Sequence, residues 1–248
     1  MIQIKDVYRS FGAQQVLKGI NLQVRQGEIM AIVGRSGSGK TVLLKILIGL
    51  TRPQRGEILI EGEDICQLYG RRLDRLRERF GMLFQGGALF DSMTVLENVA
   101  FPLRERRKLA PEEITAQAEK MLENVGLADM GYKFPAELSG GMKKRAALAR
   151  ALITAPSIIL FDEPTTGLDP ILVRAIHQLI VDTHQTFGYT AVLVSHEIPE
   201  VFEIATRVAM IHEGKIIEEG TPQEILKSTD PLIRQFIEGR LDGPIRPI

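Results

Sequence analysis

The chain has 248 residues, its 31 lysines and arginines are balanced by 31 aspartates and glutamates, and 44% of its residues are hydrophobic. This composition excludes a disordered or collagen-like chain, and a chain without net charge has no general attraction for a polyanion. We therefore expect a globular protein that binds no nucleic acid. The apolar stretches at 42–50 and 158–161 are shorter than a bilayer requires, so no membrane span is expected. The lone Cys66 has no partner for an internal disulfide, which favours a reducing compartment.

The first part of the chain is predicted as short strands and one helix. Apolar β-type runs at 16–24 and 28–33 are separated by glycine-containing turns. A glycine-rich loop follows the second run, and residues 40–50 are compatible with a helix throughout. Strand, loop and helix in this order are typical of a nucleotide-binding α/β unit. Shorter strands are predicted at 58–60 and 80–84, as antiparallel pieces that flank this unit.

An arginine-rich stretch at 71–79 has two interpretations. Its arginines would suit a phosphate-binding patch. The spacing of Leu73, Leu76 and Phe80 instead predicts a helix with one buried face, and Asp74 and Glu78 dilute the charge. We favour the solvated basic helix.

The middle of the chain, residues 86–138, shows no convincing strand. Pro111 begins a predicted helix, because the apolar residues at 114, 118, 121, 122 and 125 share one face before Gly126. We expect a helical insertion here.

The later part of the chain alternates helices with buried strands. Helices are predicted at 142–152 and 171–187, and strands at 157–161 and 190–195. Such alternation indicates a parallel sheet. A hairpin at 208–218 and a short helix at 222–227 complete the predicted elements.

The glycine-rich loop fits the phosphate-loop pattern of glycine, four residues, then Gly-Lys-Ser/Thr. In such a loop the backbone N–H groups and the helix N-terminus bind phosphate, Lys40 reaches the β and γ oxygens, and Thr41 ligates Mg²⁺. The alternative is an ordinary glycine turn before a helix, which the strand context disfavours. The predicted phosphate-binding residues are Gly34, Arg35, Ser36, Gly37, Ser38, Gly39, Lys40 and Thr41.

Two acids, Asp162 and Glu163, follow the apolar strand predicted at 157–161. Parallel sheets bind ligands at the carboxyl ends of their strands. Asp162 is predicted to hold Mg²⁺, and Glu163 to accept a proton from the water that attacks the γ-phosphate, or to orient it. Alone, the pair would be better interpreted as solvated acids; beside a phosphate loop, catalytic acids are favoured.

The sequence Leu-Ser-Gly-Gly-Met at 138–142 resembles the signature Leu-Ser-Gly-Gly-Gln of the ATP-binding cassette (ABC) family. Ser139, Gly140 and Gly141 would offer a second set of phosphate donors at a helix start, whereas alone they would indicate only a helix N-cap. The resemblance implies a P-loop NTPase of the ABC nucleotide-binding type, a single domain over 1–248. Its nucleotide-binding core would be 1–85 with 142–248, and its helical subdomain 86–141.

The resemblance to the ABC family also assigns roles to isolated residues. Phe11 matches the aromatic residue that stacks on adenine, Gln85 the glutamine that senses water and Mg²⁺, Asp169 the D-loop, and His196 the switch histidine. The implied cofactors are ATP and Mg²⁺. The implied catalytic residues are Glu163, His196 and Gln85, and the implied metal ligands are Thr41, Gln85 and Asp162.

Within the family, residues 82–103 and Met142 resemble the Mla-type (MCE-associated) phospholipid-transport ATPases. This resemblance implies a peripheral protein on the cytoplasmic face of the inner membrane that energises phospholipid transport and maintains outer-membrane asymmetry. Its partners would be a multi-span permease, an MCE-type lipid-binding protein and a small STAS-type regulatory subunit. The alternatives are the ATPase of another transporter, such as a methionine-type importer, and a soluble cassette protein of translation or DNA repair.

Two sets of phosphate donors imply a homodimer. ATP bound at Lys40 of one subunit would be covered by the signature residues of the other. Family resemblance further places a cytoplasmic helix of the permease against residues 86–103. Leu89 and Phe90 are the expected exposed anchors, although internal packing would also explain this apolar run.

Overall fold

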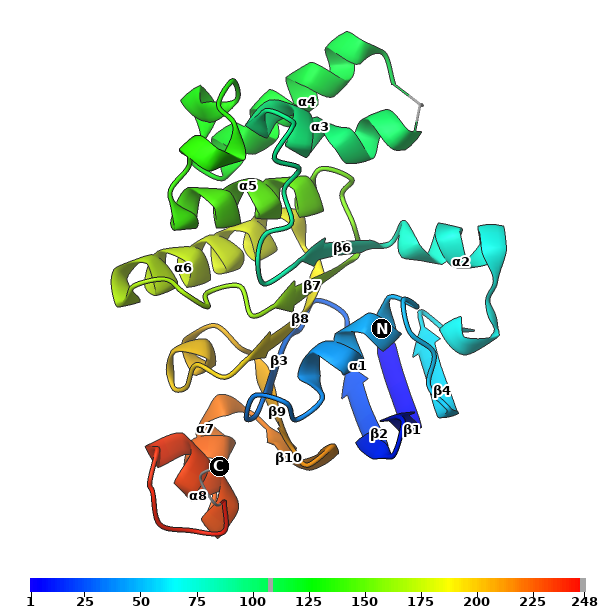
Figure 1. Cartoon of the computed structure of the whole chain (residues 1–248), viewed down its shortest axis with the longest axis vertical. Coiled ribbons are helices and arrows are strands. Elements are labelled where there is room, and N and C mark those ends of the chain that lie inside the picture. Colours follow the sequence, from blue (N-terminus) through cyan, green and yellow to red (C-terminus); the bar gives the residue numbers. More distant parts are fainter. Residues whose placement is uncertain (107–108, 246–248) are drawn as a thin grey trace. The chain divides into compact units, whose positions relative to one another are not determined.

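The computed structural model describes residues 1–106 and 109–245 (Figure 1). The chain forms two compact units, the first of Met1–Arg77 with Val192–Ile248 and the second of Glu78–Ala191. The expected core and helical subdomain, divided at 85/86 and 141/142, stay a prediction. Residues 107–108 of that subdomain and 246–248 of that core lie outside the described residues.

The first unit opens with an antiparallel sheet whose strand order is β2-β1-β4-β5. In β1 the side chains of Ile2 and Ile4 are buried and those of Gln3 and Lys5 are exposed, so one face of the strand packs inward. This alternation is short, and β1 was not predicted from the sequence. The strands are β1 (Ile2–Phe11), β2 (Gln14–Val24), β4 (Arg55–Ile60) and β5 (Glu63–Asp64).

Parallel pairing in the first unit begins with β3 (Ile29–Val33), which is buried along its whole length. β3 pairs in parallel with β9 (Arg207–His212), and β9 pairs in antiparallel fashion with β10 (Lys215–Gly220). A strand buried on both faces reads as a continuous apolar run, as Ile-Met-Ala-Ile-Val does here. The predicted strand at 28–33 and the predicted hairpin are confirmed.

Helix α1 (Lys40–Leu47) follows the glycine-rich loop after β3, as predicted, but ends three residues before the predicted limit at Leu50. Gly49 follows at φ +70°, a conformation in which glycine commonly ends helices. Leu43, Leu44 and Leu47 are completely buried, and each such burial contributes roughly 1.5–3 kcal/mol. The start of α1 is thereby fixed within the first unit.

In the sequence, helix α2 of the first unit precedes the second unit, and helices α7 and α8 follow it. In α2 (Gly70–Arg77) Leu73 and Leu76 are buried and the arginines at 71, 72 and 75 are exposed, which confirms the solvated basic helix. α7 (Pro222–Leu226) and α8 (Pro231–Glu238) each begin with proline after a capping side chain. α8 was not predicted from the sequence, although it carries this signal.

In the second unit, residues from the middle of the sequence form a group of packed helices. α3 (Val95–Arg106) and α4 (Pro111–Asn124) pack against each other and against α5 (Gly140–Leu152), as Figure 1 shows. The face predicted for α4 is buried. No strand lies between 86 and 138 among the residues described, in agreement with the predicted helical insertion.

The rest of the second unit is α/β in character. β6 (Phe80–Leu83) pairs in parallel with β7 (Ile158–Asp162), and α6 (Pro170–Phe187) follows β7. The entirely buried β8 (Thr190–Ser195) begins in this unit and ends in the first. β7, α6 and β8 confirm the predicted alternation. The strand at 80–84 was predicted as an antiparallel flanking piece, and this was wrong, because β6 pairs in parallel with β7. In the part of the chain that the structure describes, no helix has both the length and the apolar composition needed to cross a membrane.

Candidate functional site

The phosphate loop of the first unit is organised around Lys40. The ammonium group of Lys40 donates to the carbonyl oxygens of Gly34, at 2.7 Å, and Arg35, at 3.0 Å. Lys40 is 4% exposed, so its charge is held at the loop rather than in solvent. A buried ammonium bonded to carbonyls suits a ligand that brings negative charge.

Two glycines of the loop are required by the surrounding backbone. Gly39 adopts φ +104°, and a Cβ there would lie 2.7 Å from Leu17 Cδ2. A Cβ at Gly34 would lie 2.2 Å from the carbonyl oxygen of Ile211. The shape of the loop therefore depends on residues without a side chain. Such residues also allow the backbone to approach a phosphate closely.

Ser38 supplies a direct sign that the loop is built for a polar ligand. Ser38 is 8% exposed, and its hydroxyl oxygen has no hydrogen-bond partner among the residues described. A buried hydroxyl without a partner costs free energy, on the order of 1–3 kcal/mol. A phosphate oxygen at the loop would satisfy it.

Phe11 lies at the end of β1 and is 48% exposed. The guanidinium of Arg9 lies 4.6 Å from its ring centroid. An exposed aromatic ring at a strand end is available for stacking on a planar base, and this role of Phe11 stays a prediction. Arg9, which the sequence analysis did not single out, would add a cation–π contact beside that base.

The second unit brings Gln85 and Glu163 together. Leu83 of β6 pairs with Phe161 of β7 in a parallel register, so the residues two positions further on, Gln85 and Glu163, leave the sheet at the same level. Gln85 Nε2 donates to Glu163 Oε2 at 3.1 Å. Two residues predicted for catalysis are thus in direct contact.

Asp162 and Glu163 differ sharply although they are neighbours. Asp162 ends β7 and is 6% exposed, whereas Glu163 is half-buried and adopts φ +48°. A left-handed conformation costs a residue with a Cβ about 1–2 kcal/mol and turns the chain abruptly. The two neighbouring residues therefore differ in burial and in backbone conformation. Thr166, which the sequence analysis missed, donates its hydroxyl to Glu163 Oε2 at 3.1 Å.

The signature residues form the start of α5. Ser139 is exposed, and its hydroxyl oxygen accepts from the N–H of Met142 at 3.3 Å, so it is the N-cap that the alternative interpretation expects. Ideal Cβ atoms at Gly140 and Gly141 would lie 3.4 Å from Leu168 and 3.3 Å from Leu172. Leu168 and Leu172 thus lie close to the start of the signature helix.

Asp169 and His196 are both exposed. The Asp169 carboxylate caps α6 by accepting from Ile171 N at 3.0 Å and Leu172 N at 3.1 Å. His196 comes directly after β8 in the first unit. Their roles in a dimer and at a γ-phosphate stay predictions.

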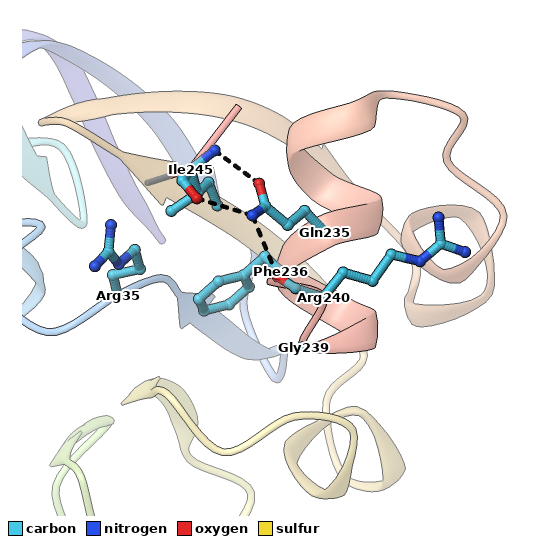
Figure 2. Close-up of a pocket in the computed structure, with 6 residues that line it drawn as sticks. All are labelled: Arg35, Gln235, Phe236, Gly239, Arg240 and Ile245. Carbon is cyan, nitrogen blue, oxygen red and sulfur yellow. Dashed lines mark hydrogen bonds between the residues drawn. The ribbon is translucent and has the colours of Figure 1, made fainter. Parts of the chain in front are cut away.

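The C-terminal segment of the first unit lies beside the phosphate loop. A pocket of about 280 Å³ separates Arg35 from α8, with Phe236 pointing into it (Figure 2). Gln235, 5% exposed, accepts from Ile245 N at 2.7 Å and donates to Ile245 O at 2.8 Å. The chain after α8 is therefore folded back onto its own helix.

A glycine-rich loop that holds a buried lysine at a strand–helix junction, together with an acidic strand end, defines a nucleotide-binding protein of the P-loop class. A family profile described as ABC transporter matches residues 17–166, more than half of the chain. The chain belongs to the ABC transporter family.

Characterised relatives match along nearly the whole chain. The intermembrane phospholipid transport system ATP-binding protein MlaF of Haemophilus influenzae is 46% identical over 99% of this chain and 93% of the relative. MlaF of Escherichia coli strain K12 is 42% identical over 99% of this chain and 91% of the relative. A probable ribonucleotide transport ATP-binding protein, mkl of Mycobacterium leprae, is 43% identical over 98% of this chain and 70% of the relative.

A solved structure of an ATP-binding cassette, a dimer in a post-hydrolysis state bound to ADP and Pi, resembles this chain with a TM-score of 0.81. It is 33% identical, and the match covers 90% of this chain and 99% of that one. This similarity confirms the predicted P-loop fold of the ABC type.

Proposed function

We propose that this chain is the ATP-hydrolysing subunit of an ABC transporter that moves phospholipid between membranes. The observation that carries the proposal is the 46% identity to a phospholipid-transport ATP-binding protein over 99% of the chain. The resemblance of residues 82–103 and of Met142 to phospholipid-transport ATPases agrees with it.

In the proposed function the first unit binds ATP. Phe11 stacks on the base, the N–H groups of residues 34–41 surround the phosphates, and Lys40 meets the β and γ oxygens. The orphaned Ser38 hydroxyl and the buried Lys40 support this assignment. His196 donates a hydrogen bond to the γ-phosphate.

Mg²⁺ fits the chemistry of the predicted ligands. Thr41 offers a hydroxyl, Asp162 a buried carboxylate and Gln85 a carboxamide oxygen, and Mg²⁺ prefers oxygen ligands. When bound, Mg²⁺ would neutralise charge on the β- and γ-phosphates. Gln85 would then contribute its oxygen while its nitrogen stays on Glu163.

Glu163 performs the proton chemistry in this proposal. Its carboxylate accepts a proton from the attacking water or orients that water toward the γ-phosphate. Gln85 Nε2 and Thr166 Oγ1 both donate to Oε2 of Glu163. The two donors fix the direction of the carboxylate.

The proposed active form is a homodimer. Ser139, Gly140 and Gly141 at the start of α5 cover the γ-phosphate bound by the partner subunit, and Asp169 lies at the same interface. A dimeric ATP-binding cassette among the similar structures supports this arrangement. Loss of the γ-phosphate removes the contact that joins the subunits.

The proposed partners follow from the transport function. A multi-span permease receives the motion through residues 86–103, with Phe90, 42% exposed, and the less exposed Leu89 as anchors. An MCE-type lipid-binding protein and a small STAS-type subunit complete the proposed system. The chain would act at the cytoplasmic face of the inner membrane.

A second cargo has support of its own. The mycobacterial relative named as a probable ribonucleotide transport protein is 43% identical, only three percentage points below MlaF of Haemophilus influenzae. Sequence similarity therefore supports the assignment as a transport ATPase more strongly than it supports phospholipid as the transported substrate.

Copurification separates these possibilities. The tagged chain is recovered from detergent-solubilised membranes of its native host, with the untagged host as control, and bound proteins and lipids are identified by mass spectrometry. A permease with an MCE-type protein and phospholipid supports the proposal. Recovery of a permease with another solute-binding partner would keep the assignment as an ATPase and change the proposed cargo. Recovery of soluble partners alone would overturn the proposed transport function.

A further inference from the structure

Two basic side chains of the signature helix bind the backbone of the loop that carries Gln85. Lys144 Nζ donates to the carbonyl oxygen of Gln85 itself. Arg150 donates from Nη2 to Gly87 O at 2.8 Å and from Nη1 to Ala88 O at 2.7 Å. Two residues of α5 therefore hold the carbonyl oxygens at three positions of one short loop.

The loop itself has an unfavourable backbone conformation. Gly87 adopts φ +76° and Ala88, which carries a Cβ, adopts φ +49°. A left-handed alanine costs about 1–2 kcal/mol and persists only where the surroundings impose it. The guanidinium of Arg150 donates hydrogen bonds to the carbonyl oxygens of these two residues, so it opposes relaxation of the turn.

The far end of the loop is fixed independently. Asn98 of α3 is completely buried, and its carboxamide accepts from Phe90 N at 2.7 Å and donates to Phe90 O at 3.0 Å. The Arg150 guanidinium also lies 6.0 Å from the Phe90 ring centroid. Between the end of β6 at Leu83 and this fixed end, the carbonyl oxygens of residues 85, 87 and 88 are held by Lys144 and Arg150.

Both basic side chains are costly to bury. Lys144 is 7% exposed, and burial lowers the pKa of Arg150. Desolvating a cation is unfavourable unless hydrogen bonds compensate for the lost water. Carbonyl oxygens of the loop that carries Gln85 supply such hydrogen bonds to both side chains.

We infer that Lys144 and Arg150 are positioning residues: they couple the signature helix to Gln85 and hold the Gln85 carboxamide against Glu163. The contacts form a continuous path from α5, through the carbonyls of residues 85, 87 and 88, to the 3.1 Å hydrogen bond on Glu163. A shift of the signature helix therefore changes the support of the hydrolytic carboxylate. The catalytic part of this inference rests on the proposed ATP hydrolysis.

Arg145 provides a matched control on the same helix. Its guanidinium donates to a backbone carbonyl, that of Val125, at 3.2 Å, but this carbonyl belongs to the segment after α4. Arg145→Lys and Arg150→Lys thus make the same chemical change in one helix. Lysine keeps the charge but cannot reproduce the two-pronged contact of a guanidinium.

The first measurement uses the nucleotide-free chain. Amide hydrogen exchange is compared in wild type, Arg150→Lys, Lys144→Met and Arg145→Lys, over the peptide 85–94. Exchange in this peptide should become about five- to tenfold faster in Arg150→Lys and Lys144→Met, because local opening follows the loss of local contacts. It should be unchanged in Arg145→Lys.

The second measurement is steady-state ATP hydrolysis. Arg150→Lys should lower kcat about tenfold, as loss of an orienting contact typically does, while KM for ATP changes less than about twofold. In a Gln85→Ala background the same substitution should have almost no further effect, because both changes act through one side chain. A tenfold loss in both backgrounds would assign Arg150 to general stability and overturn the inference.

The outcomes separate the inference from the proposed function. Unchanged exchange at 85–94 in both variants overturns the coupling whatever the activity. A wild-type chain without ATPase activity refutes the proposed hydrolysis, while the exchange data still decide whether Lys144 and Arg150 hold the loop. Thermal unfolding of every variant detects global loss of structure, and Lys144→Met provides a second test if Arg150→Lys fails to fold.

Discussion

Gln85 donates its side-chain N–H to the carboxylate of Glu163, with 3.1 Å between Nε2 and Oε2. The contact follows from the parallel pairing of β6 and β7, because Leu83 and Phe161 lie opposite each other two positions earlier. A proposed metal ligand and a proposed base are thereby joined by a direct hydrogen bond. Changes at either residue are expected to affect the other.

Glu163→Gln should lower ATP turnover at least about tenfold, since a general base typically contributes 10²–10⁴-fold. The neutral side chain keeps an oxygen for the donors at Gln85 and Thr166, so ATP binding should persist and the ATP-bound dimer should accumulate. Phosphate release and light scattering with ATP measure the two effects. Glu119→Gln, on the exposed side of α4, is the control. Unchanged turnover in Glu163→Gln would remove this residue as the base.

Lys40→Ala should weaken ATP binding by at least about tenfold, because charge-assisted hydrogen bonds to phosphate contribute roughly 1.5–3 kcal/mol. Fluorescent-nucleotide titration measures the affinity. Lys45→Ala removes an exposed lysine from the same helix and should leave the affinity unchanged. Equal affinities for wild type and Lys40→Ala would refute the phosphate-loop assignment.

The local elements were predictable where a short-range pattern determines them. β3 appears as a continuous apolar run and the turn before α1 as a spacing of glycines, and both were predicted at the correct place. β1 was missed although Ile2 and Ile4 alternate with polar residues, because two alternations are a weak signal until β2 and β4 pair with the strand. Tertiary pairing supplies the missing information.

The supporting residues of the site were harder to predict than its reacting residues. Thr166 lies three residues after Glu163, a spacing from which a local hydrogen bond could have been inferred. Arg150 lies 62 residues from Ala88 in sequence, and no local pattern relates a basic residue in the last turn of a helix to that loop. Such contacts can be identified only from the three-dimensional structure, in which the helix packs against the loop.

Substituting aspartate for Leu89 or Phe90 should weaken binding to the permease more than it lowers basal ATP hydrolysis. Phe90 is 42% exposed but also packs on Phe101, with 4.9 Å between ring centroids, so docking and internal packing both contribute. Copurification and basal turnover are measured together. Phe187→Asp, at 37% exposure, is the matched control. If Leu89→Asp and Phe90→Asp lower thermal stability and activity to the same extent as permease binding, the run is internal packing.

Cys66 should react slowly with iodoacetamide. Burial, and next the negative charge of Asp64, raise the pKa of its thiol to about 11. At pH 8 the thiolate fraction is therefore about a hundredfold smaller than in the urea-unfolded chain, whose thiol has an ordinary pKa near 9.

The pH profile of this reaction distinguishes a raised pKa from simple shielding of Cys66. The rate should still rise about tenfold per pH unit between pH 9 and 10 in the folded chain, where the rate in the unfolded chain levels off. Because the folded pKa is the higher one, the contribution of Cys66 to stability is complete below pH 9 and is lost between about pH 9 and 11. Asp64→Asn removes the neighbouring charge and should accelerate the reaction at pH 8. A rate in the folded chain that levels off near pH 9 would mean that access alone limits the thiol.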